Sequence, residues 1–375
     1  MTNALHNSTD SNSMISSSSP SSTIHLQNIV ANWHTLAKLS GSAETGVVVK
    51  ANAYGLGATK IAQALYEAGC RTFFTAHTNE ATEIRKAVGP LALVFLFHGL
   101  QQDNVDIVIS QDIVPVLNSL EQLKLWQKAN APFPAALHID TGMNRLGLQI
   151  KDIADAKDIL PEGRIGWVMS HLACADTPEH PMNARQLELF KKVAAVWPQA
   201  QKSLCNSAGI CLGKDFTFDL TRPGIGLYGG YSRANVFTPK HAITLTAPLL
   251  NIFSPEHFED ATIGYGATLP VKPNQRLGTV ALGYADGMLR SLSNYGFGYI
   301  KGVRCPIVGR VSMDLITLDI TNAPSDTSIL DRVEFLGQHA NIEEQARAGV
   351  TASYELLTCL GTRIPRVYEQ PEQSS

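Results

Sequence analysis

Hydrophobic and polar positions follow two different patterns along the chain. From residue 45 to about 229, short apolar runs alternate with segments whose apolar residues recur at the period of a helix. The eight apolar runs are 45–52, 71–77, 92–99, 112–118, 135–141, 163–173, 202–208 and 217–229. Eight strand–helix units predict an α/β fold of the closed (β/α)8, TIM-like barrel type, with an open doubly wound sheet as the alternative.

Two of the intervening segments carry distinct helix signals. Ser119 and Gln122 have the spacing of a capping box, and the residues after Ser119 form an approximate apolar stripe. A second amphipathic helix is predicted from about 185 to 197.

After residue 240 the pattern becomes that of an all-β region. Short strands are predicted at 277–283, 297–301, 304–311 and 315–319, with short helices near 341–347 and 353–360. We therefore expect a barrel domain over 22–240 and a mostly-β C-terminal domain over 241–375. Residues 1–21 are small, polar and rich in serine, which predicts a disordered tail, and they lack the basic start and apolar stretch of a secretory signal.

Composition narrows the class of protein. The chain has 375 residues, of which 44% are hydrophobic and 17% charged, as in ordinary globular proteins. A net charge of -3 argues against nucleic-acid binding, and the longest apolar run, 91–97, is too short to span a membrane. The six cysteines have no metal-ligand or paired spacing, so we expect reduced thiols, no metal site and a cytoplasmic location.

Lys50 is the most informative single residue. It follows the β-branched run Val47–Val49, which should be buried in a sheet, where a charged ammonium is unfavourable. Burial lowers the pKa of a lysine and leaves a nucleophilic amine that can form an imine. Gly55 and Gly57 follow, and they predict a tight turn into a helix at the catalytic face of a barrel.

Other polar residues gather at the ends of the predicted strands. They are His138, Asp140, Arg145, His171, Asn206, Ser207 and Arg222. The segments 206–209 and 222–226 follow strands seven and eight, where barrels bind phosphate, and they offer glycines, backbone N–H groups and a hydroxyl. A reactive lysine beside a phosphate site predicts pyridoxal 5′-phosphate as the cofactor.

Ordered motifs in both domains carry a resemblance to a known family. They are residues 49–55, 140–147, 170–173, 206–208, 222–225, 264–268, 283–287, 309–314, 353–355 and 363–366. Through them the chain resembles the alanine racemase family from about residue 22 to 370. The resemblance implies a cytoplasmic homodimer with composite active sites that interconverts L- and D-alanine, supplying D-alanine for peptidoglycan.

The resemblance also implies a role for each matching residue. Lys50 would hold the cofactor covalently and act as the base on the D-alanine face, and Tyr265 of the partner subunit would be the base on the L-alanine face. Arg145 and the backbone of the partner subunit's Met313 would contact the substrate, and Tyr284 would line the entrance. The residues expected at the cofactor are Tyr54, His171, Asn206, Ser207, Arg222, Gly224, Ile225 and Tyr354.

Arg222 bears on the type of reaction. A permanently charged guanidinium should leave the pyridine nitrogen unprotonated and weaken the electron sink, which favours racemisation over transamination. A barrel decarboxylase of basic amino acids, the first alternative, would be expected to place an acid there and to use a catalytic cysteine. A lone-barrel carrier of the cofactor and a racemase of broader specificity, for example for serine, are further alternatives.

Two positions depart from the pattern of the family. His138 stands where many relatives have a lysine whose carbamate orients the substrate-binding arginine, and Leu56 replaces the usual histidine of the Ala-Tyr-Gly-His-Gly turn. We expect His138, or a small anion beside it, to help hold Arg145 in this protein.

Overall fold

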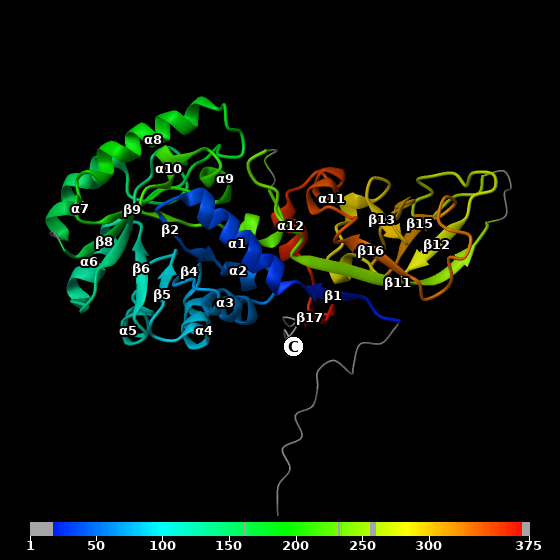
Figure 1. The fold of residues 1–375 in the computed structure, drawn as a ribbon, viewed down its shortest axis with the longest axis horizontal. Coiled ribbons are helices and arrows are strands. Elements are labelled where there is room, and N and C mark those ends of the chain that lie inside the picture. Colours follow the sequence, from blue (N-terminus) through cyan, green and yellow to red (C-terminus); the bar gives the residue numbers. More distant parts are fainter. Residues whose placement is uncertain (1–17, 161–162, 232, 234, 256–259, 370–375) are drawn as a thin grey trace, which may run out of the picture. The chain divides into compact units, whose positions relative to one another are not determined.

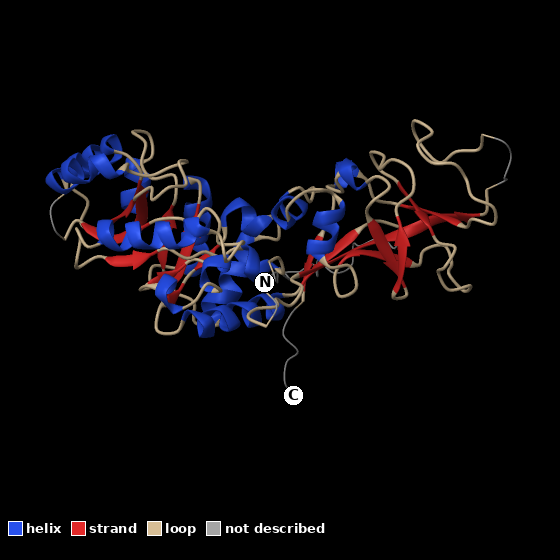
Figure 2. Cartoon of the chain, turned by 90° about the horizontal axis from the view of Figure 1, so that it is seen from above, coloured by secondary structure: helices blue, strands red, loops and turns tan. Residues whose placement is uncertain are grey.

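The chain divides into two compact units (Figure 1). The computed structural model describes residues 18–160, 163–231, 233, 235–255 and 260–369. One unit spans Leu26–Ala242, and the other combines the N-terminal segment up to His25 with the chain from Ile243 onward. Helices are concentrated in the first unit, whereas strands and loops dominate the second (Figure 2).

The unit from 26 to 242 is built on parallel strands. Seven of them pair in sequence order, each with the next: β3 (Val47–Val48), β4 (Thr72–Thr75), β5 (Leu93–Leu96), β6 (Ile113–Leu117), β7 (Ala135–His138), β8 (Ile165–Met169) and β9 (Gln201–Ser203). The short strands β2 (Glu44–Thr45) and β10 (Leu220–Thr221) form a second parallel pair. Since β2 runs into β3 with only Gly46 between them, the two act as one interrupted strand.

Strand β10 closes the barrel between the first strand, β2–β3, and the segment that follows β9. On one side the N–H groups of Gly46 and Val48 donate to the carbonyls of Thr221 and Pro223, at 3.0 and 2.9 Å. On the other side the N–H of Arg222 donates to the carbonyl of Cys205 at 2.9 Å. The predicted eight-stranded parallel barrel is therefore confirmed, and no edge of its sheet is left open.

Helices precede, connect and follow the strands of the barrel (Figure 1). They are α1 (Leu26–Ser40), α3 (Ala58–Glu67), α4 (Thr78–Val88), α5 (Val105–Ser110), α6 (Leu120–Ala129), η2 (Ile150–Asp152), α7 (Ile153–Ile159), α8 (Pro181–Ala194), α9 (Ser207–Ile210), α10 (Lys214–Thr217) and η3 (Ile225–Tyr228). The hydroxyl oxygen of Ser119 accepts from the N–H of Gln122 at the start of α6, as the capping signal predicts. The helix predicted at 185–197 is α8, which begins with Pro181 in its first turn.

The second unit is mostly β, as predicted. Its main sheet has the order β14-β13-β16-β11-β1-β17, and β12 pairs with β11 and β15. The elements are β1 (Ser21–Ile24), β11 (Ile243–Phe253), β12 (Leu277–Val280), η4 (Tyr284–Asp286), η5 (Arg290–Leu292), β13 (Phe297–Ile300), β14 (Val303–Pro306), β15 (Ile316–Asp319), β16 (Arg332–Leu336), α11 (Ile342–Ala348), α12 (Ser353–Thr358) and β17 (Arg366–Tyr368).

The N-terminal segment differs from the expected division of the chain. The expectation was a disordered tail over 1–21 and a barrel beginning at 22. Residues 1–17 lie outside the described part of the chain. Strand β1, however, pairs antiparallel with β11 and parallel with β17, so residues 21–24 belong to the sheet of the C-terminal unit. The pairing joins segments more than two hundred residues apart, which a local pattern cannot reveal.

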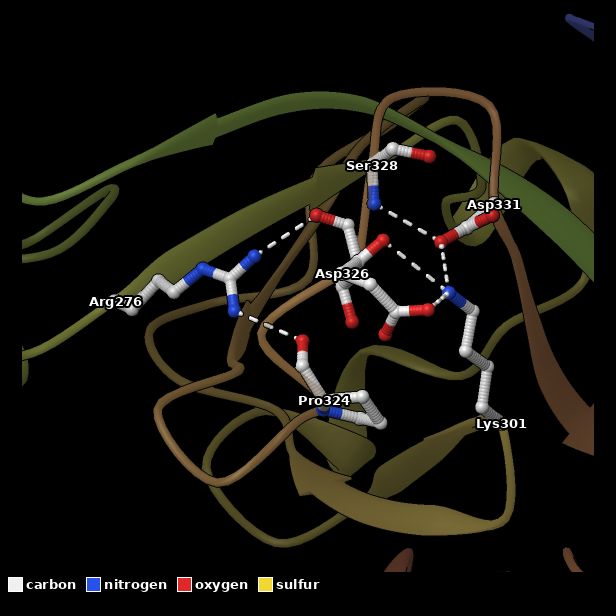
Figure 3. Close-up of polar contacts among 7 residues, drawn as sticks. Arg276, Lys301, Pro324, Asp326, Ser328 and Asp331 are labelled. Carbon is white, nitrogen blue, oxygen red and sulfur yellow. Dashed lines mark hydrogen bonds and ion pairs between the residues drawn. The ribbon is translucent and has the colours of Figure 1, made fainter.

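Two cations hold the loop that precedes β16 (Figure 3). The Nζ of Lys301 lies 2.9 Å from Oδ2 of Asp326 and 3.2 Å from Oδ2 of Asp331. Arg276 donates to the backbone carbonyls of Pro324 and Thr327, at 3.2 and 2.9 Å. These contacts fix a long surface loop in a unit that has few helices to support it.

The described residues contain no helix long and apolar enough to cross a membrane. All six cysteines lie in described segments as free thiols. Within the same segments, no cluster of His, Cys, Asp and Glu side chains could hold a metal ion.

Candidate active site

Lys50 lies at the carboxyl end of the first barrel strand, immediately after Val49. Its side chain is partly buried, and its Nζ lies 6.0 Å from the ring centroid of Phe97. Burial lowers the pKa of Lys50, and the positive charge of Arg145 lowers it further, while Glu80 acts in the opposite direction. The structure therefore places an amine of increased nucleophilicity at the catalytic face of the barrel.

The chain turns sharply after Lys50 through a left-handed segment. Residues 51–54 all have φ between 52° and 55°, a conformation that disfavours L-residues by about 1–2 kcal/mol each. The N–H of Ala53 donates to Val49 O at 2.8 Å, and the N–H of Gly57 donates to Asn52 O at 2.9 Å. The side chain of Asn52 also accepts from the N–H of Ala58 at the start of α3. Such a conformation persists because the surrounding contacts hold it, and it is common at functional sites.

Tyr54, Ser207 and Gly224 come together at the ends of strands one, seven and eight. The hydroxyl oxygen of Ser207 accepts from the N–H groups of Gly224 and Gly226, at 3.0 and 3.1 Å. A Cβ added to Gly224 would lie 2.4 Å from the Tyr54 hydroxyl, so only glycine permits this approach. Since the Ser207 hydroxyl accepts twice, its proton is available for an acceptor such as a phosphate oxygen. Three of the residues predicted to hold a phosphate thus lie together within the barrel unit.

Asn206 and Ile225 directly precede and follow two of these residues, Ser207 and Gly224. The Oδ1 of Asn206 accepts from the N–H of Gly209 at 2.8 Å, which orients the turn that carries Ser207. Ile225 is buried at the start of η3. Tyr54 is buried as well, and its ring lies 4.8 Å from that of Tyr228, whose hydroxyl donates to Val48 O at 2.7 Å.

Arg222 is a buried cation at the end of the eighth strand. Its guanidinium donates to the Ser203 hydroxyl and to the backbone carbonyls of Ser170 and Leu204. Burial lowers the pKa of Arg222 to about 10, so the group is still charged at neutral pH. Among the described residues, no carboxylate forms an ion pair with it. A buried guanidinium held by neutral groups suits an uncharged partner with a lone pair.

His171 follows strand β8 on the same face. Its carbonyl accepts from the side-chain amide of Gln186 at 2.9 Å. Burial holds the pKa of His171 well below its usual range, and the charge of Arg222 lowers it further. His171 is therefore a neutral imidazole beside a permanent cation.

Hydrogen bonds determine which nitrogen of His138 carries the proton. The side-chain amide of Asn118 donates to the backbone carbonyls of Phe97 and Val116, at 2.9 and 2.7 Å. Its oxygen therefore faces the Nδ1 of His138, 2.9 Å away, and Nδ1 must be the donor. Burial lowers the pKa of His138 to about 4. The imidazole is neutral, and its Nε2 is an acceptor.

Arg145 lies on a loop that is closed at its base. The N–H of Leu148 donates to His138 O at 2.8 Å, and the N–H of Asp140 donates to Leu148 O at 2.9 Å. A Cβ on Gly147, where φ is +113°, would meet the His138 ring at 3.2 Å. Burial alone would raise the pKa of Asp140, but backbone N–H groups, including those of Gly142 and Met143, hold it below its usual value. Arg145 itself is exposed.

Tyr265 lies at an exposed turn of the C-terminal unit, with 72% of its surface accessible. The N–H of Ile263 donates to Leu269 O at 2.9 Å, which closes the loop around it. A Cβ on Gly266, where φ is +77°, would lie 2.9 Å from the Arg310 guanidinium. The motif at 264–268 therefore contacts the motif at 309–314 within this unit.

Met313 and Tyr284 lie in adjoining loops of the same unit. The N–H groups of Tyr284 and Ala285 donate to the carbonyls of Ser312 and Met313, each at 3.0 Å. Both Met313 and Tyr284 have exposed side chains. Three motifs of the sequence thus share one surface region, defined by 264–266, 283–286 and 309–314. Tyr354, the remaining expected cofactor contact, lies half-exposed on α12 of this unit.

Two residues of the barrel site were not predicted from the sequence. Asn118 is the last residue of the apolar run 112–118. The predicted site residues also lie at the ends of apolar runs, so this position could have identified Asn118. Glu80 lies in the first turn of α4 and accepts from the N–H of Ala51 at 2.6 Å. A glutamate in a first helical turn is ordinary, so sequence alone gave no reason to select it.

Comparison with known proteins covers both units. The model of the alanine racemase N-terminal domain matches residues 24–232, and that of the alanine racemase C-terminal domain matches 242–368. A catabolic alanine racemase of Agrobacterium fabrum is 43% identical over 361 residues, covering 94% of this chain and 92% of the relative. An alanine racemase of Brucella abortus is 42% identical over 368 residues, covering 92% of each.

Solved structures agree with this match. The alanine racemase of Bartonella henselae, whose crystal structure has covalently bound pyridoxal phosphate, gives a TM-score of 0.88 at 38% identity, over 94% of this chain and 99% of that one. The biosynthetic enzyme of Pseudomonas aeruginosa gives 0.87 at 31% identity, over the same shares of the two chains. With both domains matched, and with relatives similar over nearly the full length, this chain belongs to the alanine racemase family.

Proposed function

We propose that this protein is a pyridoxal 5′-phosphate-dependent alanine racemase that interconverts L- and D-alanine. The observation that carries the proposal is that the barrel strand ends provide both a partly buried amine, Lys50, and a buried guanidinium, Arg222, that has no acidic partner among the described residues. Membership of the family makes alanine the expected substrate.

The residues of the barrel face fit this cofactor. Lys50 would hold it covalently, and Arg222 would face its ring nitrogen as a donor, with His171 nearby. The residues that would hold the phosphate are Tyr54, Asn206, Ser207, Gly224, Ile225 and Tyr354. When bound, pyridoxal 5′-phosphate supplies an electron sink for the electron pair left on the substrate α-carbon after deprotonation.

Racemisation needs a proton-transfer group on each face of the substrate. Lys50, whose pKa is lowered by its burial, would exchange the proton on the D-alanine face. Tyr265 of the partner subunit would exchange the proton on the L-alanine face, and its exposed turn allows it to reach beyond its own unit. One group on each face avoids moving a single base across the substrate.

Arg145 and Met313 would orient the substrate. The guanidinium of Arg145 is exposed on its loop and can pair with a carboxylate. The carbonyl of Met313 already accepts from Ala285, so a backbone contact from the partner subunit's Met313 to substrate would use its N–H. Both contacts recognise the carboxylate common to all amino acids, and specificity for a small side chain depends on packing in the assembled site.

The charge of Arg222 favours this reaction over decarboxylation. A guanidinium donates hydrogen bonds and cannot act as an acid at neutral pH, so the ring nitrogen would stay unprotonated. The decarboxylase alternative requires an acidic group at that place and a catalytic cysteine. Cys205 and Cys211, which lie closest in sequence to this site, are buried thiols whose pKa is raised by that burial.

The proposal is tested by incubating the purified protein with L-alanine in heavy water. D-alanine should appear with deuterium at the α-carbon, and the protein should absorb near ~420 nm as isolated. Borohydride should fix the cofactor on the peptide that contains Lys50. Fixation on another lysine, or none, would exclude the cofactor assignment. A panel of L-amino acids would decide between alanine and a broader range of substrates, such as serine.

We further propose that the enzyme acts in the cytoplasm and provides D-alanine for peptidoglycan. Relatives are described both as catabolic and as biosynthetic, so the physiological role needs its own test. Loss of this protein should make growth dependent on added D-alanine. Growth without D-alanine, accompanied by failure to use alanine as a carbon source, would instead assign a catabolic role.

A further inference from the structure

Glu80 connects the turn after Lys50 to the start of helix α4. One carboxylate oxygen, Oε1, accepts from the N–H of Ala51 at 2.6 Å. The other, Oε2, accepts from the N–H groups of Ala76 and His77, at 2.9 and 3.2 Å. The side chain of Glu80 therefore connects the loop after the first barrel strand to the loop after the second.

The contact falls at a strained point of the backbone. Ala51 is the first of four consecutive residues in the left-handed region, and it directly follows Lys50. Further hydrogen bonds of this turn start from the N–H groups of Ala53, Gly55, Leu56 and Gly57. The N–H of Ala51 donates to Glu80, so Glu80 fixes the beginning of the turn, where the direction of the Lys50 side chain is set.

The chemistry at this position requires a carboxylate. Both oxygens accept from backbone N–H groups, and a glutamine would have to turn an NH2 group toward one of these donors. A glutamine of the same shape would therefore lose at least one bond and place two donors in opposition. An aspartate keeps the charge but is one methylene shorter, so it cannot reach both sets of N–H groups from the same backbone position.

We propose that Glu80 is a positioning residue, whose carboxylate holds the left-handed turn at Ala51 against the N-terminus of α4 and thereby fixes the amine of Lys50. This inference rests on the proposed function, because it assigns Lys50 a reaction to be positioned for. The charge of Arg145 lowers the pKa of Lys50, whereas the negative charge of Glu80 raises it. The same carboxylate therefore affects both the position and the protonation of the amine.

The test compares Glu80→Gln and Glu80→Asp with Glu83→Gln, a matched control on the exposed face of α4. Amide hydrogen exchange of the full-length protein as isolated should speed up about tenfold in the segment 51–57 of both Glu80 variants, because a charge-assisted bond is lost. Exchange in the strand at 47–48 serves as an internal reference. Glu83→Gln should match the wild type.

Steady-state kinetics then separate positioning from folding. In both Glu80 variants kcat should fall by about tenfold or more, while KM for alanine changes little, because a misplaced group acts on the reaction and not on binding. Wild-type exchange in Glu80→Gln would overturn the proposal, as would faster exchange with unchanged kcat. Full activity of Glu80→Asp would also overturn it, because the shorter side chain cannot reach both sets of N–H groups. If the wild type does not racemise alanine, the proposed function fails, yet the exchange data still report on the contact.

Discussion

His138 is held in one protonation state by its neighbours. Asn118 accepts from Nδ1, and burial lowers the pKa of the ring to about 4. The acceptor at Nε2 is therefore present throughout the neutral range. The charges of Arg222 and Arg145 lower the pKa of this imidazole further. We expect this neutral acceptor to help hold Arg145 at the position where the family pattern implies a carbamylated lysine.

The low pKa of His138 should make the protein sensitive to acid. Between pH 6.5, the ordinary value, and about 4, the unfolded chain binds a proton that the folded protein excludes, so the free energy of unfolding decreases as the pH falls through this range. His138→Gln keeps a donor for Asn118 and removes the titration. Urea unfolding at several pH values should show a pH slope smaller by up to about 1.4 kcal/mol per unit. His34→Gln, on the exposed face of α1, should retain the wild-type slope.

Removing the side chain of His138 should weaken substrate binding. In His138→Ala the Nε2 acceptor is lost, and we expect KM for alanine to rise about tenfold, the effect of one hydrogen bond to a charged group. Removing bicarbonate should leave wild-type activity unchanged, because an imidazole forms no stable carbamate. His34→Ala is the control. An unchanged KM and kcat in His138→Ala would show that Arg145 is held by other groups.

A site residue can be predicted from sequence when its residue type is unusual at its position in a strand, turn or helix. Lys50 and Arg222 are charged residues at the ends of apolar runs, and such positions are rarely charged without a reason. Asn118 and Glu80 are ordinary residues for a strand end and a first helical turn. Their importance comes from contacts with residues at other strand ends, and these contacts exist only once the barrel has closed.

At the scale of elements, the strand–helix alternation predicted the barrel because each strand is buried and each helix is amphipathic. The left-handed turn at 51–54 was not predicted, since none of its residues is a glycine and local preference opposes it. In the second unit the short antiparallel strands were predicted from their turns. Strands β1, β11, β16 and β17 were not among the predicted strands. Of these, β1 and β17 are short and are defined only by distant partners.

The loops of the C-terminal unit should depend on Gly283. A Cβ at this position would lie 2.1 Å from the carbonyl oxygen of Met313, which is backbone and cannot move aside. Gly283→Ala should therefore separate the Tyr284 and Met313 loops and lower the free energy of unfolding by about 2 kcal/mol or more, as overpacking of backbone does. Activity should fall with it.

Thermal unfolding with Gly41→Ala provides the comparison. Gly41 has a φ of +70°, but an added Cβ meets nothing within 4 Å, so only the conformational cost of about 1 kcal/mol is expected. Equal destabilisation by the two substitutions would show that the close approach at Gly283 is unimportant.

At the scale of the whole molecule, the two proposed bases lie on different units of the chain. Lys50 belongs to the barrel and Tyr265 to the β-rich unit. If Tyr265 acts in the site of the partner subunit, a two-fold dimer contains two equivalent sites, each requiring both chains. Lys50→Ala and Tyr265→Ala should each abolish racemisation as homodimers.

Mixing the two inactive variants should restore activity after subunit exchange. A heterodimer has one site with both bases and one with neither. At equal mixing about half of the dimers are heterodimers, so roughly a quarter of wild-type activity is expected. Exchange should be verified independently with differently tagged chains. Verified exchange without recovered activity would place Tyr265 in the site of its own chain, or outside the site altogether.

The pairing of β1 has a consequence for synthesis of the protein. Ser21–Ile24 is the first strand to leave the ribosome, but it pairs with β11 and with β17, which ends at Tyr368. The barrel has all of its strands once Thr221 has emerged, whereas the β sheet is complete only after Arg366–Tyr368 has emerged. The barrel is therefore the first unit that can become compact during translation, while the early strand remains extended. Its sequence, Ser-Ser-Thr-Ile, offers little apolar surface for incorrect association during that delay.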